Sequence, residues 1–174
     1  ENNNGTWTQI GSDIDGEGSY DESGISVSLS SDGSVVAIGA RYDDDGGTNS
    51  GHVRIYENDN GTWTQIGSDI DGESSSDYSG YAVSLSADGS VVAIGAYAND
   101  GGGSNSGHVR IYENNNGTWA QIGSDINGES SYDSSGSSVS LSADGSVVAI
   151  GAYGNDGGGS NSGHVRIYEN NNGT

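Results

Sequence analysis

The stretch "ISVSLSSDGSVVAIGA", from Ile25 to Ala40, predicts a β-hairpin and decides the fold class. Its first half alternates strictly, so that Ile25, Val27 and Leu29 share one face while serines occupy the other. "SSDGS" then marks a tight turn, and "VVAIGA", which begins at Val35, is apolar on both faces, as is typical of a strand covered on both sides. No segment shows helical periodicity over ten residues, so we predict an all-β protein.

The hairpin recurs because the chain is a tandem repeat with a period of 56 residues. Repeat 1 spans residues 1–56, repeat 2 spans 57–112, repeat 3 spans 113–168, and 169–174 start a fourth with the same "ENNNGT" that opens the chain. Only 12 of 56 positions differ between the first two repeats and 8 between the last two, which indicates recent duplication. We therefore expect a window on a longer array or assembly, with one constant rotation and translation between repeats.

Each repeat is expected to form about four short strands. "TWTQIG" (Thr6 to Gly11) and "HVRIYE" (His52 to Glu57, with Val53 and Ile55 inward) flank the central hairpin, and the Asn-Gly of "ENNNGT" suits a tight hairpin turn. One such sheet cannot bury its own apolar face and must stack on its neighbours. Four strands per unit is typical of a β-propeller blade. A β-trefoil, which also has three four-stranded units, is the alternative.

The repeat also resembles a known family. The run "SGISVSLSSDGSVVAIGA…SGHVRIYENDNGTWTQIGSDIDGE" is similar to the FG-GAP-like repeats of integrin-type propellers, particularly those of secreted and surface proteins of microbes and algae. The resemblance recurs in all three repeats and so covers the whole chain. The repeat departs from the family at Ser23-Gly24, where Phe-Gly is usual, and at Gly39-Ala40-Arg41, where Gly-Ala-Pro is usual. The resemblance implies a role in extracellular adhesion or scaffolding.

The net charge argues against several kinds of partner. The formal net charge is −21, and the only basic side chains apart from three histidines are Arg41, Arg54, Arg110 and Arg166. Nucleic acid is not expected as a partner, because its binding requires cations to replace the counterions on phosphate. An anionic membrane surface is not expected for the same reason. The sequence has no cysteine and therefore no disulfide, and it has no apolar run long enough for a membrane span.

The acidic residues raise the question of a metal. The family resemblance implies calcium in the loop between the first two strands, but that loop is reduced here to "SSDGS" or "SADGS", with Asp32, Asp88 or Asp144 as a single carboxylate. Calcium takes six to eight oxygen ligands, so the family site looks deleted. The remaining acidic loops are "SDIDGE", which also contains Glu17, and "YDDDGG". They supply five metal candidates: Asp13, Asp15, Asp43, Asp44 and Asp45. The competing interpretation is solvated turn residues, with no cofactor bound.

Enzymatic chemistry is not expected, and no catalytic residue is assigned. His52, His108 and His164 occupy one equivalent position, whereas an active site needs differently tuned groups that converge in one place. These histidines are expected as polar residues that enter a strand. The glycine run "NDGGGSNSG" precedes a strand and lacks the lysine of a phosphate-binding loop.

Asn-Gly-Thr forms an N-glycosylation acceptor sequence at Asn4, Asn60, Asn116 and Asn172. Hairpin and strand preferences alone can produce this triplet, yet an exposed hairpin tip is also an accessible place for a glycan. Variable loops contain several tyrosines among small residues, which is typical both of adaptable binding loops and of sequence drift.

These observations favour a non-enzymatic extracellular or cell-surface protein that builds a fibre or scaffold. The expected partners are further repeats or copies of the chain and attached N-glycans, with no nucleic acid and no membrane insertion. An adhesive, ligand-binding propeller assisted by calcium is the alternative.

Overall fold

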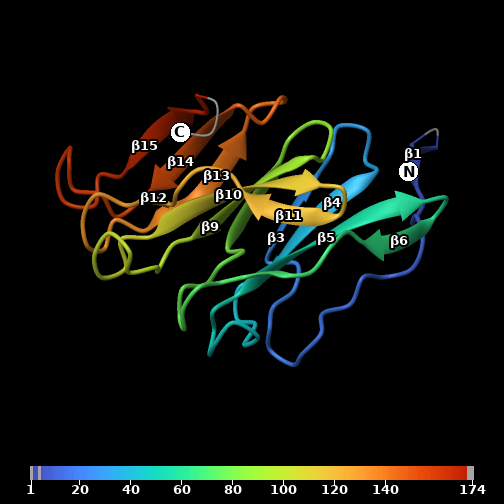
Figure 1. Cartoon of the computed structure of the whole chain (residues 1–174), viewed down its shortest axis with the longest axis horizontal. Coiled ribbons are helices and arrows are strands. Elements are labelled where there is room, and N and C mark those ends of the chain that lie inside the picture. Colours follow the sequence, from blue (N-terminus) through green and yellow to red (C-terminus); the bar gives the residue numbers. More distant parts are fainter. Residues whose placement is uncertain (1, 4, 172–174) are drawn as a thin grey trace.

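The computed structural model describes residues 2–3 and 5–171, and these form strands and turns with no helix (Figure 1). Three antiparallel sheets follow one another along the molecule, and β1 and β15 lie at opposite ends of its long axis. The all-β prediction is confirmed.

Blade 1 is the first of these sheets. It contains β3 (Ser26–Leu29), β4 (Val35–Ala40), β5 (His52–Asp59), β6 (Thr62–Gln65) and β7 (Ile70–Asp71). The order is β3-β4-β5-β6, and β7 pairs with β5 beyond the end of β6, so β6 and β7 are two halves of one outer strand.

Blade 2 repeats this arrangement, and blade 3 has three strands among the described residues. Blade 2 contains β8 (Ala82–Leu85), β9 (Val91–Ala96), β10 (His108–Asn115), β11 (Thr118–Gln121) and β12 (Ile126–Asn127). Blade 3 contains β13 (Ser135–Leu141), β14 (Val147–Ala152) and β15 (His164–Glu169). A separate hairpin pairs β1 (Asn2–Asn3) with β2 (Thr6–Trp7).

The blades are out of phase with the sequence repeats. The outer strand of blade 1 comes from repeat 2, and the outer strand of blade 2 comes from repeat 3. The link is the Asn-Gly turn. Asn60 and Gly61 have φ of 50° and 92° and form a two-residue loop between Asp59 and Thr62. A two-residue hairpin turn of this type requires positive φ at both central residues, and Asn-Gly adopts these angles readily. The hairpin prediction is therefore confirmed.

The blades stack front to back. We call the face of each blade that carries the valine and leucine of its first strand the front face, and the opposite face the back face. Val83 and Leu85 on the front of blade 2 share a core with Val53 and Ile55 on the back of blade 1. The back of blade 2, with Val109, packs in the same way on the front of blade 3 in a second core.

This stacking explains why "VVAIGA" is apolar on both faces. The strand lies at the centre of each blade, and in β9 all six residues are buried. The backbone hydrogen-bond ladders pair strands of the same blade. In the described part of the chain, one isolated bridge, between Gly107 and Ser135, joins two of the sheets. The architecture is therefore of propeller type and not the alternative β-trefoil.

Candidate functional site

In the part of the chain that the structure describes, two blade faces are uncovered. On the front of blade 1, Val27 is 64% and Leu29 is 59% exposed, whereas their counterparts in blade 2, Val83 and Leu85, are 9% and 7% exposed. The same residue types at the same positions thus lie inside an interface in one blade and in solvent in the other.

The back of blade 3 shows the same contrast. Val165 and Ile167 are 66% and 70% exposed, while the equivalent Val53 and Ile55 of blade 1 are 0% and 2% exposed. Exposed apolar side chains that gather on one face mark an interaction surface.

Polar contacts fix the register between blades. The hydroxyl of Ser28 accepts a hydrogen bond from the backbone N–H of Leu85 at 2.9 Å, and Ser84 accepts from Leu141 at 3.0 Å in the next interface. Arginine adds a second recurring bond, because Arg110 Nη2 donates to the carbonyl oxygen of Asp71 at 2.7 Å. The recurrence of these bonds shows that both interfaces use one geometry.

A cavity of about 340 Å³ lies between the outer parts of blades 2 and 3, and its apolar lining includes Ile111, Ile122 and Tyr168. The equivalent place between blades 1 and 2 is occupied by Trp119, whose Nε1 donates to the carbonyl oxygen of Ile66 at 2.9 Å.

Glycine contacts show the same difference. A Cβ on Gly67 would meet Trp119, whereas a Cβ on the equivalent Gly123 would meet no described atom within 4 Å. The cavity therefore has the position and lining of a tryptophan site.

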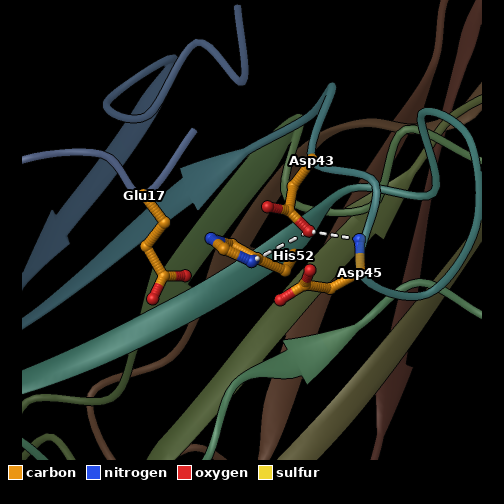
Figure 2. A group of neighbouring side chains, drawn as sticks. All are labelled: Glu17, Asp43, Asp45 and His52. Atoms are coloured by element: carbon orange, nitrogen blue, oxygen red, sulfur yellow. Dashed lines mark hydrogen bonds and ion pairs between the residues drawn. The ribbon is translucent and has the colours of Figure 1, made fainter. Parts of the chain in front are cut away.

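A second candidate site is a cluster of three carboxylates and one imidazole: Glu17, Asp43, Asp45 and His52 (Figure 2). One donor atom from each of the four lies within 4.8 Å of all the others. Asp43 and His52 are buried, while Glu17 and Asp45 are exposed. These groups are of the types that bind divalent metal ions.

Local structure brings these residues together. Asp43 Oδ1 accepts a hydrogen bond from the backbone N–H of Asp45 at 2.9 Å, which fixes the turn after β4. His52 is the first residue of β5, as expected, and its Nδ1 lies 3.2 Å from Asp43 Oδ1 (Figure 2). Glu17 arrives from the segment before blade 1, where its Oε1 lies 3.6 Å from Nη1 of Arg54.

More acid surrounds the same histidine. Asp69 and Asp71 form a second group with His52, and Asp71 pairs directly with His52 in the sheet. Burial raises the pKa of Asp71, and the negative charges of Asp69, Asp45 and Asp43 raise it further, although His52 opposes them. The cluster is thus a place of concentrated negative charge.

Repeats 2 and 3 lack this cluster. Asn99 and Gly101 stand where repeat 1 has Asp43 and Asp45, and Asn99 Nδ2 donates to Asp77 Oδ2 at 2.8 Å. His108 remains with Glu73 and Asp125 nearby. Burial, followed by the charge of Arg110, lowers the pKa of His108 to about 4.

The structure separates the five metal candidates of the sequence. Asp43 and Asp45 join the cluster. Asp13 accepts from Gln9, Asp44 accepts from the backbone of Asn49, and Asp15 contributes its backbone carbonyl to Arg54. Asp43 also differs from the expectation of a solvated turn residue, because it is only 4% exposed.

Sequence reasoning missed His52 as a member of this group, and it named Glu17 only as part of the "SDIDGE" loop. A signal was available in the repeat comparison, because the paired acids at Asp43 and Asp45 occur in repeat 1 alone.

The single carboxylate of the shortened loop accepts hydrogen bonds from residues of the same turn. Asp32 Oδ1 accepts from the backbone N–H of Ser34 and from the hydroxyls of Ser30 and Ser34. These bonds lower the pKa of Asp32 to about 2. This geometry agrees with a turn residue, as the shortened loop predicts.

Among the glycosylation candidates, Asn60 and Asn116 are exposed at hairpin tips, while Asn4 and Asn172 lie outside the described residues. The described part of the chain holds no helix that could cross a membrane.

Stacked four-stranded blades with a 56-residue period define a propeller-type repeat protein. The family model described as "FG-GAP repeat" matches residues 12–56, 69–112 and 127–168, well over half of the sequence. The chain belongs to the FG-GAP repeat family, which confirms the resemblance seen in the sequence.

Solved β-propellers share the fold. A Bacteroides uniformis protein named as a 6-phosphogluconolactonase aligns over 84% of this chain and 36% of its own, with a TM-score of 0.56 and 18% identity. The periplasmic gluconolactonase of Pseudomonas aeruginosa aligns over 83% of this chain and 38% of its own, with a TM-score of 0.51 and 17% identity. The chain thus spans a little over a third of each, and these likenesses show the fold alone. No curated protein sequence matches the chain.

Proposed function

We propose that the chain is a non-enzymatic, extracellular structural repeat that builds a fibre or scaffold by adding blades head to tail. The observation that carries the proposal is the match between the two uncovered faces. The front of blade 1 has the residues that dock elsewhere in the chain, and the back of blade 3 has the residues that receive them. The occupant of each uncovered face is therefore another blade of this repeat, which in a solution of this chain is a second copy.

The tryptophan cavity supports the same contact. Trp7 in β2 is 79% exposed and lies in the same "GTW" sequence that places Trp119 between blades 1 and 2. In a head-to-tail pair, the β1–β2 segment of one copy would continue the sheet of blade 3 in the other. Trp7 would then enter the cavity beside Ile122 and Tyr168.

The contact is heterologous, because two different surfaces meet. Such a contact produces a ring if the rotation closes and an open filament if it does not. In a filament each chain adds three blades, and every interface repeats the two already present inside the chain. Chain-to-chain contacts would then have the same apolar cores and serine hydrogen bonds as the internal ones.

Other features support the remaining parts of the proposal. FG-GAP repeats are typically found in extracellular or surface domains, and a net charge of −21 suits a solvated, self-repelling outer surface. The three histidines occupy one equivalent strand position, each followed by Val-Arg-Ile-Tyr, which favours a structural role over catalysis.

Sedimentation velocity across a concentration series, followed by electron microscopy of the largest species, tests the proposal. The wild-type chain should associate reversibly and form filaments. The double variant V27S/L29S should remain folded and monomeric, because its substitutions lie on an uncovered face. W7S should weaken association in the same direction.

The matched control is V83S/L85S, which places the same changes in a buried interface. This variant should lose stability, since each buried aliphatic side chain contributes about 2–3 kcal/mol. A wild-type chain that stays monomeric at its highest soluble concentration would contradict the proposal. A discrete closed ring would contradict the fibre and favour a self-contained propeller.

An adhesive role is the second candidate, and one observation favours it. Tyr42, Tyr78, Tyr81 and Tyr97 gather at the junction of blades 1 and 2, with Tyr78 and Tyr97 stacked at 5.5 Å between ring centroids. The guanidinium of Arg41 lies 4.4 Å from the centre of the Tyr42 ring. The counterparts of Tyr42 and Tyr78 at the next junction are Ala98 and Ser134, so this surface differs from the one between blades 2 and 3. Loss of cell-surface binding in Y78S, with assembly unchanged, would favour this role.

A further inference from the structure

We propose that Glu17, Asp43, Asp45 and His52 form a binding site for one divalent transition-metal ion of the zinc class. The site lies in repeat 1, beside the entrance of β5, where His52 is on the front face of blade 1. It also differs from the calcium loop implied by the family, which is the shortened turn around Asp32.

The first argument is the unused imidazole nitrogen. His52 is 1% exposed, and its Nδ1 makes no hydrogen bond to any described residue, although it lies 3.2 Å from Asp43 Oδ1. A buried polar atom without a partner is costly and calls for an explanation. In Figure 2 this nitrogen faces Asp43, with the carboxylates of Glu17 and Asp45 on either side. A metal ion among them would supply the missing partner.

The second argument is the spacing of the donor atoms. Zinc–ligand bonds of about 2.0–2.1 Å place the ligands of a tetrahedral site about 3.3–3.5 Å apart. His52 Nδ1 and Asp43 Oδ1 are 3.2 Å apart, which is close to this ligand–ligand distance. These two residues are also the buried members of the four. Glu17 and Asp45 are exposed and within 4.8 Å of them. Because both side chains are exposed, they have room to rotate towards the buried pair and complete the coordination.

The third argument is charge. Three carboxylates meet here, and Asp69 and Asp71, which form a second group with the same histidine, add negative charge. Arg54 forms an ion pair with one of the three carboxylates, Glu17, at 3.6 Å. Like charges at these distances repel, and a divalent cation converts the repulsion into attraction.

The donor set selects the metal. Calcium prefers six to eight oxygen atoms, whereas imidazole together with a few carboxylates suits zinc and its neighbours in the first transition row. One nitrogen and three carboxylate groups match the smaller coordination number. We therefore expect Zn²⁺ to bind more tightly than Ca²⁺.

Repeats 2 and 3 provide the natural comparison. They keep the glutamate and the histidine, as Glu73 and His108, but have Asn and Gly in place of the two aspartates. In repeat 2, Asn99 donates to Asp77, a bond that the carboxylate of Asp43 cannot make. Repeat 1 therefore gives up a loop hydrogen bond and gains two carboxylates that face a histidine.

Isothermal titration of the 174-residue chain with ZnCl₂, with thermal unfolding in parallel, tests the proposal. The wild-type chain should bind one Zn²⁺, and its Tm should rise with the Zn²⁺ concentration. D43N/D45G, which restores the loop of the other repeats, should fold normally. Loss of an outer partner alone weakens metal binding about 10–100-fold, so loss of two ligands should weaken it at least about 100-fold.

Two further variants distinguish a specific metal site from the general attraction of cations to an acidic protein. D13N/D44N removes the same amount of charge outside the cluster and should leave binding unchanged. N99D/G101D places both aspartates beside Glu73 and His108 and should raise the number of bound Zn²⁺ from one to two. Undiminished zinc binding in D43N/D45G would overturn the proposal. So would Ca²⁺ binding at this site as tightly as Zn²⁺, or a single bound Zn²⁺ in N99D/G101D.

Discussion

The hydroxyl of Ser28 accepts a hydrogen bond from the backbone N–H of Leu85, 57 residues further along the chain and in the next blade. The same bond recurs one period later, from Leu141 to Ser84. A serine that alternation alone assigns to the solvent face of a strand is therefore part of an interface between blades. Ser140, the third member of the series, is exposed, because no described blade follows it.

This series predicts the effect of removing the hydroxyl. Ser28→Ala leaves the N–H of Leu85 without its partner in a partly buried interface, which should reduce the free energy of unfolding by about 1–2 kcal/mol. Chemical denaturation measures this change. Ser140→Ala is the matched control and should have almost no effect in the isolated chain. Equal losses in the two variants would show that the hydroxyl contributes only within its own blade.

Close approach of backbones at Gly95 allows a second prediction. A Cβ on Gly95 would clash with the backbone carbonyl of Gly136, on the first strand of blade 3. Because a backbone group cannot rotate away, Gly95→Ala should force blades 2 and 3 apart and reduce the free energy of unfolding by roughly 3 kcal/mol.

The matched control for this substitution is Gly151→Ala. At Gly151 the added Cβ would meet the hydroxyl of Ser138, which is a side chain that can change rotamer. We expect a much smaller loss of stability, seen as a smaller fall in Tm. A fall as large as that of Gly95→Ala would mean that the strand itself, and not the contact between blades, excludes alanine.

The sequence predicted the blades well because its strands carry strong local patterns. Alternation in "ISVSLS", the doubly apolar "VVAIGA" and the Asn-Gly turn each depend on neighbouring residues, and all three appear as expected. The 56-residue period also indicated that the apolar face of one repeat packs on the next repeat, because a single sheet cannot bury its own apolar face.

Contacts between distant positions were harder to predict. Glu17 and His52 are 35 positions apart and lie together only because the segment before blade 1 passes the entrance of β5. The serine bonds between blades likewise depend on the distance and angle between two sheets. The alternation within one strand determines neither this distance nor this angle. Alternation alone therefore assigns Ser28 to the solvent face.

N-glycans are predicted at the Asn-Gly-Thr sites if the producing organism is a eukaryote. Asn60 and Asn116 are exposed at hairpin tips, so a glycan there would not cover the apolar faces. Asn4 and Asn172 carry the same acceptor sequence. Intact mass of native material before and after enzymatic deglycosylation measures occupancy, and assembly should be the same in both states. An unmodified native mass would contradict this prediction.

The buried His108 predicts a loss of stability in mild acid. Burial and Arg110 lower its pKa to about 4 in the folded chain, while the ordinary value is 6.5. Between these values the unfolded chain binds more protons, so the free energy of unfolding falls as the pH falls from about 6.5 towards 4. A shift of this size corresponds to about 3 kcal/mol from this group.

Other groups around His108 adjust the net slope. Glu73 Oε2 lies 3.9 Å from Nδ1 of the imidazole, and the charge of Asp125 favours the charged form of His108. Asp77, whose pKa is raised mainly by burial, changes stability in the opposite direction over part of the range. Denaturation series between pH 7.5 and 4, in a buffer free of transition metals, measure the slope. His108→Gln cannot gain the proton and should flatten the dependence above pH 4, whatever its effect on stability at pH 7. An unchanged slope in this variant would show that His108 does not cause the acid sensitivity.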